Sequence, residues 1–544
     1  MQRRAEGPKV NDGVDGQTEL VVALVAAVGT DVGMISDEVA IDLDAYAYEV
    51  HQLRLSEYLA EEAGEDFNEK KFDERIWEAM TAGDQLRDAW DRSDALALHA
   101  ISDIAATREQ LAGTAEDDRQ PRSLDRHAFV LRSLKTPDEL ETLRAIYGSR
   151  LIVIAAYSPK DQRLEHLARQ IAASRGTENR SKWVHQPQEL IARDEKEERA
   201  GGQDVSGTFH RADFFVRGWS REVARTDIRR VLEILFGSPF RTPTRDEHGQ
   251  FIAAGAALRS AEFSRQVGAA IATPKGSVIA VGTNEVPKAG GGSHWEEDGK
   301  GNRDFEVGDL DTNRKHFDAL AKQLTTRIDE RVEELVDEAG TSDQLQDLRS
   351  RLKDVLPDEL RKGGLKDLTE FGRAVHAEMS ALIDAGLRGV AVAGATIYTT
   401  TFPCHNCARH LIGAGIVRVV FVEPYTKSRA EQLHADSATI ARTGDVSGKV
   451  AFEPFVGVAP RRYLQLFDAT ARERLGHLGR KDEDGRKREW VKKKALPVLA
   501  DAGLPQFRPD PPEYRIRELL ALDHFAEHTG KGSVRRADEA TSRS

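Results

Sequence analysis

The first strong pattern along the chain is an uninterrupted apolar run over residues 20–28, followed at once by Gly29-Thr-Asp-Val-Gly33. An apolar run of this length that ends in glycines predicts a buried strand of a parallel sheet entering a turn. A helix is expected next, from about Met34 to Leu43. Further strand-like runs, separated by charge-laced helical stretches, lie at 49–53, 128–131, 151–157 and 212–216. This alternation predicts a doubly wound α/β domain over about 18–245.

A second pattern begins near Phe251. A helix is expected over 254–266, and two short strands, 267–272 and 277–282, are joined by a Pro-Lys-Gly turn, which predicts a hairpin. A helix over about 368–385 then precedes a strand at 396–400, a helix opening at Cys404 and a strand at 417–422. The pattern predicts a second α/β domain over 250–475.

The second domain is interrupted by a predicted helical insertion at about 296–367. Between 313 and 339, apolar residues recur every three or four positions, which fits one face of a helix. Another helix is expected near 343–355. Outside the two domains, residues 1–17 are predicted to be a flexible N-terminus. Residues 476–544 are predicted to be a charged, partly disordered C-terminal extension.

Composition and charge restrict the classes of protein to which the chain can belong. The chain has 544 residues, of which 40% are hydrophobic and 31% charged, so it can bury a sizeable core under a well-solvated surface. Its formal net charge of -13 disfavours a large footprint on nucleic acid or an anionic membrane. The apolar runs are far shorter than a membrane span requires, and residues 1–18 do not have the pattern of a secretory signal. We therefore expect a cytoplasmic protein.

The candidate chemistry lies in two short motifs, His376-Ala-Glu378 and Pro403-Cys404-His-Asn-Cys407, which contain the only two cysteines of the chain. Catalytic zinc takes three protein ligands and leaves the fourth position for water, and one histidine with two cysteines meets that count. Cysteines three positions apart share a helix face, and the first turn of a helix favours thiolate. We predict zinc ligation by His376, Cys404 and Cys407.

Glu378 is better suited to moving protons than to binding the metal, because a fourth protein ligand would leave no room for the attacking water. Each motif alone has a simpler interpretation. A Cys-x-x-Cys pair can be redox-active or merely buried, and His-x-Glu occurs by chance. Their occurrence together, in this order and with proline before the first cysteine, favours the zinc site.

Together these motifs resemble the signature of the zinc-dependent nucleoside and nucleotide deaminases. The resemblance implies that His376, Cys404 and Cys407 bind zinc and that a water of lowered pKa attacks C4 of cytosine. It also implies that Glu378 accepts the proton of this water, protonates the ring nitrogen and assists the loss of ammonia.

The flanking segments 266–269, 282–287 and 414–416 look like deoxycytidylate deaminase. That resemblance implies that Asn284 lies against the nucleotide sugar and that the backbone N–H of Ala377 meets the base carbonyl. Tyr425, Lys427 and Ser428 follow the strand after the zinc helix, where a phosphate-bearing substrate could be reached. The alternatives are a plain turn residue for Asn284 and a solvated surface lysine for Lys427.

The loop Gly29-Thr30-Asp31-Val32-Gly33 stands where a phosphate-binding loop belongs, between a buried strand and a helix N-terminus. The pattern of an active P-loop is not met, because the spacing is short and no lysine follows Gly33. Asp31 would also repel phosphate. We expect a degenerate nucleotide-binding domain or a purely architectural one.

A P-loop-kinase-like first half joined to a deoxycytidylate-deaminase-like second half resembles the bacterial anti-phage dCTP deaminases. Membership would imply deamination of dCTP and dCMP, depletion of dCTP during infection, a homo-oligomer and, in some relatives, restraint by a small RNA. Two alternatives stay open. One is a deaminase of tRNA or single-stranded DNA, and the other is a nucleotide-sensing regulator with a structural zinc.

Overall fold

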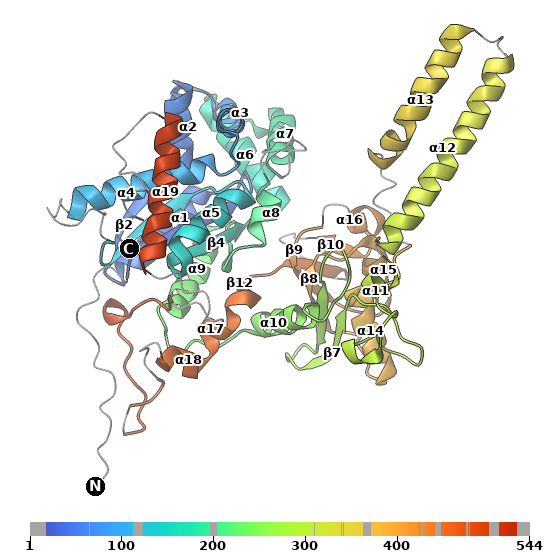
Figure 1. Cartoon of the computed structure of the whole chain (residues 1–544). Helices are drawn as coiled ribbons and strands as arrows, with labels where there is room; N and C mark the ends of the chain where they lie inside the picture. Colours follow the sequence, from blue (N-terminus) through green and yellow to red (C-terminus); the bar gives the residue numbers. More distant parts are fainter. Residues whose placement is uncertain are drawn as a thin grey trace. The chain divides into compact units, whose positions relative to one another are not determined.

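The computed structural model describes residues 18–64, 66–112, 123–195, 204–308, 310–338, 340, 342–362, 371–425, 428–440, 448–474, 477, 479–482, 484–499 and 511–529. The fold is mixed α/β, with two six-stranded sheets in two compact units (Figure 1). The first unit holds the described residues up to Glu247 and those from Pro454 onward, and the second holds those from His248 to Glu453. Among these residues, no helix is long and apolar enough to cross a membrane.

The sheet of the first unit has the order β12-β5-β4-β1-β3-β2, and its first five strands along the chain run parallel. All seven residues of β1 are buried, as expected of a central parallel strand covered on both faces. The predicted strands are confirmed. They are β1 (Leu20–Ala26), β2 (Glu49–Arg54), β3 (His127–Arg132), β4 (Leu151–Tyr157) and β5 (Phe214–Arg217), with β12 (Gly457–Val458) antiparallel at the edge.

One face of this sheet is covered by α1 (Val32–Asp44) and α9 (Arg221–Leu235), whose apolar side chains meet Leu20, Val22 and Leu24 of β1. Alternate residues of a strand point to opposite faces, so the residues between them belong to the other face. The remaining helices before residue 245 are α2 (Leu55–Ala63), α3 (Phe72–Trp90), α4 (Ala95–Ala112), α5 (Pro137–Tyr147), α6 (Lys160–Ser174), α7 (His185–Glu195) and α8 (Val205–Phe209).

The chain returns to the first unit from Pro454, whereas the sequence pattern predicts a second domain that extends to 475. Strand β12 pairs with β5, and α19 (Pro511–Thr529) packs on α4 and α5. Arg108 of α4 is buried between Glu19 and Glu518, and its Nη1 donates to Glu518 at 2.6 Å. A two-residue strand and an ion pair between residues far apart in the sequence produce no hydrophobic periodicity. The sequence pattern therefore does not predict this return of the chain. The short helices α17 (Tyr463–Phe467) and α18 (Ala469–Arg474) lie between these elements.

The second unit has the sheet order β10-β11-β9-β8-β6-β7. The predicted hairpin is confirmed, β6 also pairs antiparallel with β8, and β8 runs parallel to β9. The strands are β6 (Gly268–Ala272), β7 (Val278–Thr283), β8 (Thr396–Thr401), β9 (Arg418–Glu423), β10 (Ala438–Ile440) and β11 (Val450–Pro454). One face packs on α14 (Ala377–Leu387) and α15 (His405–Gly413), beyond which lies α16 (Ala430–Leu433). The other face packs on α10 (Arg245–Ala257), because Gly268 of β6 lies against the α10 backbone.

Two helices start elsewhere than predicted. The helix expected over 254–266 is α10, which begins at Arg245 and ends at Ala257. Beyond it, the Glu262 carboxylate accepts hydrogen bonds from the backbone N–H groups of Ser264 and Arg265 and forms a turn, so these residues are not helical. The helix expected over 368–385 is α14, which begins at Ala377, and residues 368–370 of the prediction lie outside the described residues. Val375 instead forms a bridge with Glu285, and its extended backbone is incompatible with a helix at that point.

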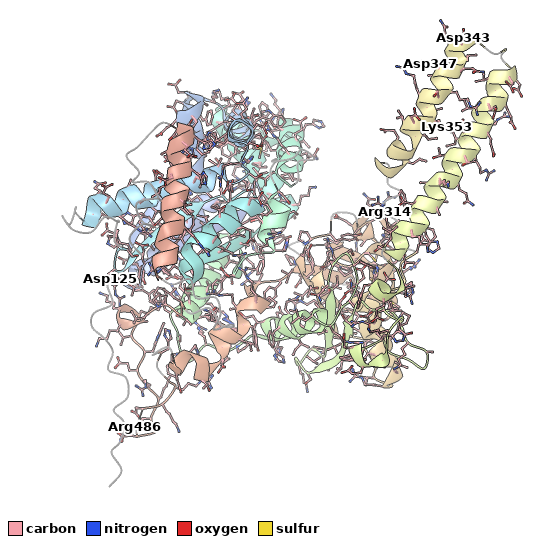
Figure 2. The ribbon with its side chains drawn as sticks, in the orientation of Figure 1. Asp125, Arg314, Asp343, Asp347, Lys353 and Arg486 are labelled. Atoms are coloured by element: carbon pink, nitrogen blue, oxygen red, sulfur yellow. The ribbon has the colours of Figure 1, made fainter. Side chains whose placement is uncertain are left out.

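The predicted insertion contains a short helix, α11 (Asp304–Val307), and two long helices, α12 (Thr312–Glu338) and α13 (Asp343–Lys362). The long helices pair as an antiparallel hairpin (Figure 1). Arg349 and Lys353 of α13 each reach Asp329 of α12, at 2.8 and 2.9 Å, and Figure 2 shows Lys353 on the side of α13 that faces α12. Paired charges therefore join the two helices.

Candidate zinc site and its cavity

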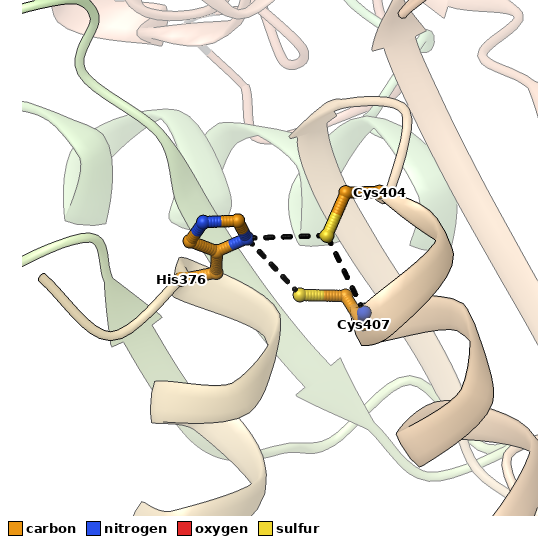
Figure 3. A group of neighbouring side chains, drawn as sticks. All are labelled: His376, Cys404 and Cys407. Atoms are coloured by element: carbon orange, nitrogen blue, oxygen red, sulfur yellow. Dashed lines mark hydrogen bonds between the residues drawn. The ribbon is translucent and has the colours of Figure 1, made fainter. Parts of the chain in front are cut away.

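Three side chains converge where two helices of the second unit begin (Figure 3). His376 is the N-cap residue of α14, and Cys404 is the N-cap residue of α15. The Nδ1 atom of His376 lies 3.3 Å from Sγ of Cys404 and 3.5 Å from Sγ of Cys407. The three predicted ligands are thus brought together by two helix N-termini that pack on one face of the sheet.

These distances fit a zinc ion. Zinc binds thiolate at about 2.3 Å and imidazole nitrogen at about 2.0 to 2.1 Å, so a tetrahedral ion places its nitrogen and sulfur ligands about 3.6 Å apart. All three ligand atoms lie within 4.8 Å of one another, and both cysteines are buried and free of disulfides. The donor set and its spacing are those of a catalytic zinc site with three protein ligands.

Without a metal ion, the electrostatics of the group are those of a thiolate beside an imidazolium, and the hydrogen bond to Cys404 raises the pKa of the Cys407 thiol. A hydrogen bond from Cys407, together with His376, lowers the pKa of Cys404 to about 4. The hydrogen bond to Cys404 in turn raises the pKa of His376 to about 9. The Cys407 backbone N–H also donates to Cys404 Sγ at 3.4 Å. The group therefore holds a thiolate at neutral pH, and thiolate is the form of cysteine that binds metal.

Glu378 lies in the first turn of α14, two residues after the histidine, and is 4% exposed. Burial raises the pKa of its carboxyl group. The carboxyl group lies in the same cavity wall as His376 and Cys404. A carboxyl group whose pKa is moved towards neutrality can both accept and return a proton, as general acid–base catalysis requires.

A cavity of about 360 Å³ opens onto the site. Its volume is within the range of roughly 300 to 1,000 Å³ that is typical of small-molecule pockets. Its wall includes His376, Ala377, Glu378 and Cys404, so the candidate proton carrier and two ligands face the space that a substrate would occupy.

The other predicted substrate-binding residues differ in position. Asn284 lines the cavity, but its side chain also fixes the adjacent loop: Oδ1 accepts from Val267 N–H at 2.7 Å, and Nδ2 donates to the Arg265 carbonyl at 2.8 Å. Ala377 is fully buried in the cavity wall. As the first residue of α14, it has a backbone N–H with no acceptor within its own helix.

Tyr425 lines the cavity too. Ser428 is not among the lining residues, and its hydroxyl donates to the Pro403 carbonyl at 2.8 Å, which ties this loop to the segment before Cys404. Lys427 lies outside the described residues.

The sequence motifs missed several polar residues of the cavity wall. Four of them come from the insertion or its ends: Asp304, Asp311, Asn313 and Arg373. Arg303 anchors the insertion, because its guanidinium pairs with the buried Glu285 at 2.6 Å. Glu262, Ser264 and Arg265 come from the turn after α10. A helical insertion shows only helical periodicity, so no sequence signal indicated that its base forms part of the site.

Close packing of α14 on β7 positions His376 and Glu378, and it requires a glycine at 282. A Cβ atom on Gly282 would lie 2.1 Å from the Ala377 carbonyl oxygen and 2.3 Å from the Ser380–Ala381 peptide nitrogen. We expect Gly282→Ala to cost roughly 1 to 3 kcal/mol of stability, as overpacking does, and to lower zinc content.

Denaturant unfolding and metal analysis check this prediction. Gly255→Ala is the matched control, because Gly255 lies in an exposed stretch of α10 with open space around it. Alanine there should be neutral or slightly stabilising. Equal stability and zinc content in the two variants would contradict the prediction.

In the first unit, the loop from Gly29 to Gly33 connects β1 with α1. Asp31 is the N-cap residue of α1, and its carboxylate accepts from Met34 N–H at 2.9 Å, so a side-chain anion already occupies this helix terminus. Gly29 has φ +90°, and its Cβ would lie 2.8 Å from Cβ of Arg163. Thr30 is buried against Gly218. The positive φ and the close packing against Arg163 therefore explain why residue 29 is a glycine.

Comparison with known proteins shows which protein family this part of the chain resembles. Residues 244–423 match the family model "Cytidine and deoxycytidylate deaminase zinc-binding region". The chain is 38% identical over 55 residues to the deoxycytidylate deaminase of Enterobacteria phage T2, covering 10% of this chain and 29% of that protein. It is 42% identical over 62 residues to ComE operon protein 2 of Bacillus subtilis (strain 168), covering 11% and 33%.

These matches span about a third of the length of those curated relatives. A solved dCMP deaminase from the cyanophage S-TIM5, in complex with dCMP and dUMP, aligns at 15% identity with a TM-score of 0.22, covering 40% of this chain and 99% of that one. The family match and the ligand geometry together support a zinc-binding region of the deaminase type within residues 244–423, with zinc as its cofactor.

Proposed function

We propose that the second unit catalyses the zinc-dependent hydrolytic deamination of deoxycytidine nucleotides, converting dCTP, dCMP or both to the uracil nucleotide and ammonia. The observation that carries this proposal is the buried Glu378 beside a His-Cys-Cys group, both facing one cavity. A three-ligand group leaves a coordination position open, as catalytic zinc sites do. The matching relatives named deoxycytidylate deaminase support the substrate class.

In this proposal, His376, Cys404 and Cys407 would hold zinc, which would lower the pKa of the water that serves as the nucleophile. Glu378 takes up the proton of that water, passes it to the ring nitrogen of cytosine and assists departure of the amino group as ammonia. The backbone N–H of Ala377 binds the base carbonyl. Asn284 holds the loop over 265–267 in place and keeps one amide N–H for the nucleotide sugar.

The test is to incubate the zinc-loaded protein separately with dCTP, dCMP, CTP and cytidine and to separate the products by chromatography. We expect uracil products from dCTP or dCMP. The two phosphate states are distinguished directly, because each substrate is offered alone. Turnover of cytidine alone, with none of either deoxynucleotide, would overturn the proposed substrate class.

Two other functions predict different outcomes. A polynucleotide deaminase would convert cytosine in single-stranded DNA or tRNA and leave free dCTP unchanged, yet the chain is only 6% aromatic and its net charge is -13, whereas such grooves are basic and rich in stacking aromatics. A regulator with a structural zinc would have no deaminase activity on any of these substrates. The open ligand position and the buried Glu378 favour the enzyme.

For the physiological role, we propose depletion of dCTP in defence against phage, as the resemblance to anti-phage dCTP deaminases implies. Bacteria that express the protein should lose dCTP on infection and yield fewer plaques, and cells that express Glu378→Gln should do neither. An unchanged dCTP pool together with full protection would separate defence from deamination.

We also propose that the first unit binds a phosphate-bearing ligand, and that it does so through arginine. A cavity of about 490 Å³ lies at the carboxyl ends of β1 and β3, and its lining includes the basic residues Arg54, Arg75, Arg132 and Lys135 as well as the acidic residues Asp31 and Glu57. Burial and the neighbouring Arg54 lower the pKa of Arg132. The Arg132 guanidinium makes no hydrogen bond or ion pair with any residue that the structure describes. An anionic ligand would pair with the Arg132 guanidinium and would raise its pKa again.

Arg132→Gln tests this second proposal through nucleotide binding measured by calorimetry with dCTP and ATP. Because a hydrogen bond to a charged group contributes about 1.5 to 3 kcal/mol, we expect affinity to fall about tenfold or more. Arg180→Gln is the control, since Arg180 is exposed and lies outside the cavity lining. Equal affinity in both variants, or no binding by the parent protein, would refute the arginine site.

Assembly and regulation are proposals as well. Light scattering should give the mass of a homo-oligomer, and a monomeric mass would contradict it. Sequencing of RNA that copurifies with the protein tests the proposed small-RNA restraint. Absence of any enriched small RNA, with full activity on isolation, would argue against it.

A further inference from the structure

A second group of metal-binding side chains lies in the first unit, at the start of two neighbouring parallel strands. Nε2 of His51 lies 2.9 Å from Nδ1 of His127, and Nε2 of His127 lies 4.0 Å from a carboxylate oxygen of Glu49. One ligand atom from each of the three residues can be chosen so that all lie within 4.8 Å of one another. We infer that Glu49, His51 and His127 form a second binding site for a divalent transition-metal ion such as Zn²⁺.

The strands hold the two histidines side by side, with their rings 5° from coplanar and the ring centroids 5.2 Å apart, so that the two nitrogens face each other. Glu49 is paired with His127 across β2 and β3, and His51 with Phe129. Residues two apart on a strand share a face, so all four side chains project from the same face of the sheet. The Phe129 ring stacks on His51 with ring centroids 5.0 Å apart, which restricts the rotation of that imidazole.

The donor set selects the class of metal. Two imidazoles and one carboxylate suit zinc and its neighbours in the first transition row, whereas calcium and magnesium prefer sites made of oxygen alone. A tetrahedral zinc ion needs its two nitrogen ligands about 3.3 Å apart, a few tenths of an ångström more than the observed separation. It also needs the two lone pairs to meet at an angle, so the His127 ring has to turn out of line with His51 to bind the ion. The Glu49 side chain is 65% exposed and free to close on the ion.

The alternative is a direct hydrogen bond, with one imidazole donating N–H to the other. Both arrangements use the same two nitrogen atoms, Nε2 of His51 and Nδ1 of His127. These nitrogens bind either the proton that they share or a metal ion. The two are distinguished by metal stoichiometry, since the chain has one further metal-binding group of this kind among the described residues, the cysteine site of the second unit.

The experiment is a titration of the metal-free, full-length protein with Co²⁺, followed by its absorption spectrum, and with Zn²⁺, followed by metal analysis after desalting. The cysteine site gives a thiolate charge-transfer band, whereas the histidine site gives only visible ligand-field absorption. We expect two equivalents in the parent protein and in Cys404→Ser one equivalent without the charge-transfer band. His51→Gln and His127→Gln should each retain one equivalent with that band.

His185→Ala is the matched control, because His185 is an exposed histidine outside the group. It should keep two equivalents. The charge-transfer band of each glutamine variant reports whether the second unit is intact, and circular dichroism reports whether the first unit remains folded. One equivalent in the parent protein, or a second equivalent that persists in both His51→Gln and His127→Gln, would overturn the inference.

Discussion

Replacement of Glu378 by glutamine is expected to lower kcat for deamination of dCTP or dCMP by roughly 10² to 10⁴-fold or more, because a positioned general acid–base group contributes about that much. Glutamine has nearly the same shape and can still hydrogen-bond, but it cannot accept and return a proton. The residue is buried beside the ligands without being one of them. We therefore expect zinc content and thermal stability to stay close to those of the parent protein.

Chromatography of the uracil product, with metal analysis on the same samples, measures this effect. Glu330→Gln is the matched control, because Glu330 lies on an exposed part of α12 outside the cavity lining, and it should keep full activity. A Glu378→Gln enzyme that loses its zinc would assign the carboxylate a structural role. One that keeps kcat would remove Glu378 from the reaction.

Loss of a zinc ligand is the second large effect. His376→Ala and Cys404→Ser each leave two ligands, and two do not hold zinc in the geometry that three provide. We expect deaminase activity to fall to background. We also expect the second unit to unfold at lower denaturant concentration, because metal that binds only the folded state stabilises it. Both His376 and Cys404 begin a helix that packs on the sheet, so the destabilisation should centre on α14 and α15.

His410→Ala tests whether this effect is specific. His410 lies in the last turn of α15, on the helix that carries both cysteines, and is exposed. It should bind zinc and deaminate as the parent protein does. If Cys404→Ser retained both zinc and activity, the catalytic ion would have to be held elsewhere.

The zinc group was predictable from sequence because each half of it is local. His376 and Glu378 are two residues apart, and Cys404 and Cys407 three apart, so short-range helix geometry places each pair. The cavity wall was not predictable in the same way. Asp304, Asp311 and Asn313 reach it only because Arg303 and the bridge between Glu285 and Val375 fix the ends of the insertion.

The strands were equally accessible to sequence reasoning, since β1 and β4 are continuous apolar runs buried along nearly their whole length. The return of the chain to the first unit after Glu453 could not be predicted from the sequence. It depends on a two-residue strand, β12, and on the burial of Arg108 between Glu19 and Glu518. Polar contacts between residues far apart in the sequence do not produce a periodic pattern.

The most direct test of the central claim is to measure deamination of dCTP and dCMP as zinc is returned to the metal-free protein. The two cysteines are the only thiols of the chain, so their reactivity with a thiol reagent reports how much of the catalytic site is empty. We predict that uracil product rises in proportion to thiol protection and that Glu378→Gln shows full protection without product. Product formation with both thiols unprotected, or none from either nucleotide at full protection, would contradict zinc-dependent deamination of deoxycytidine nucleotides.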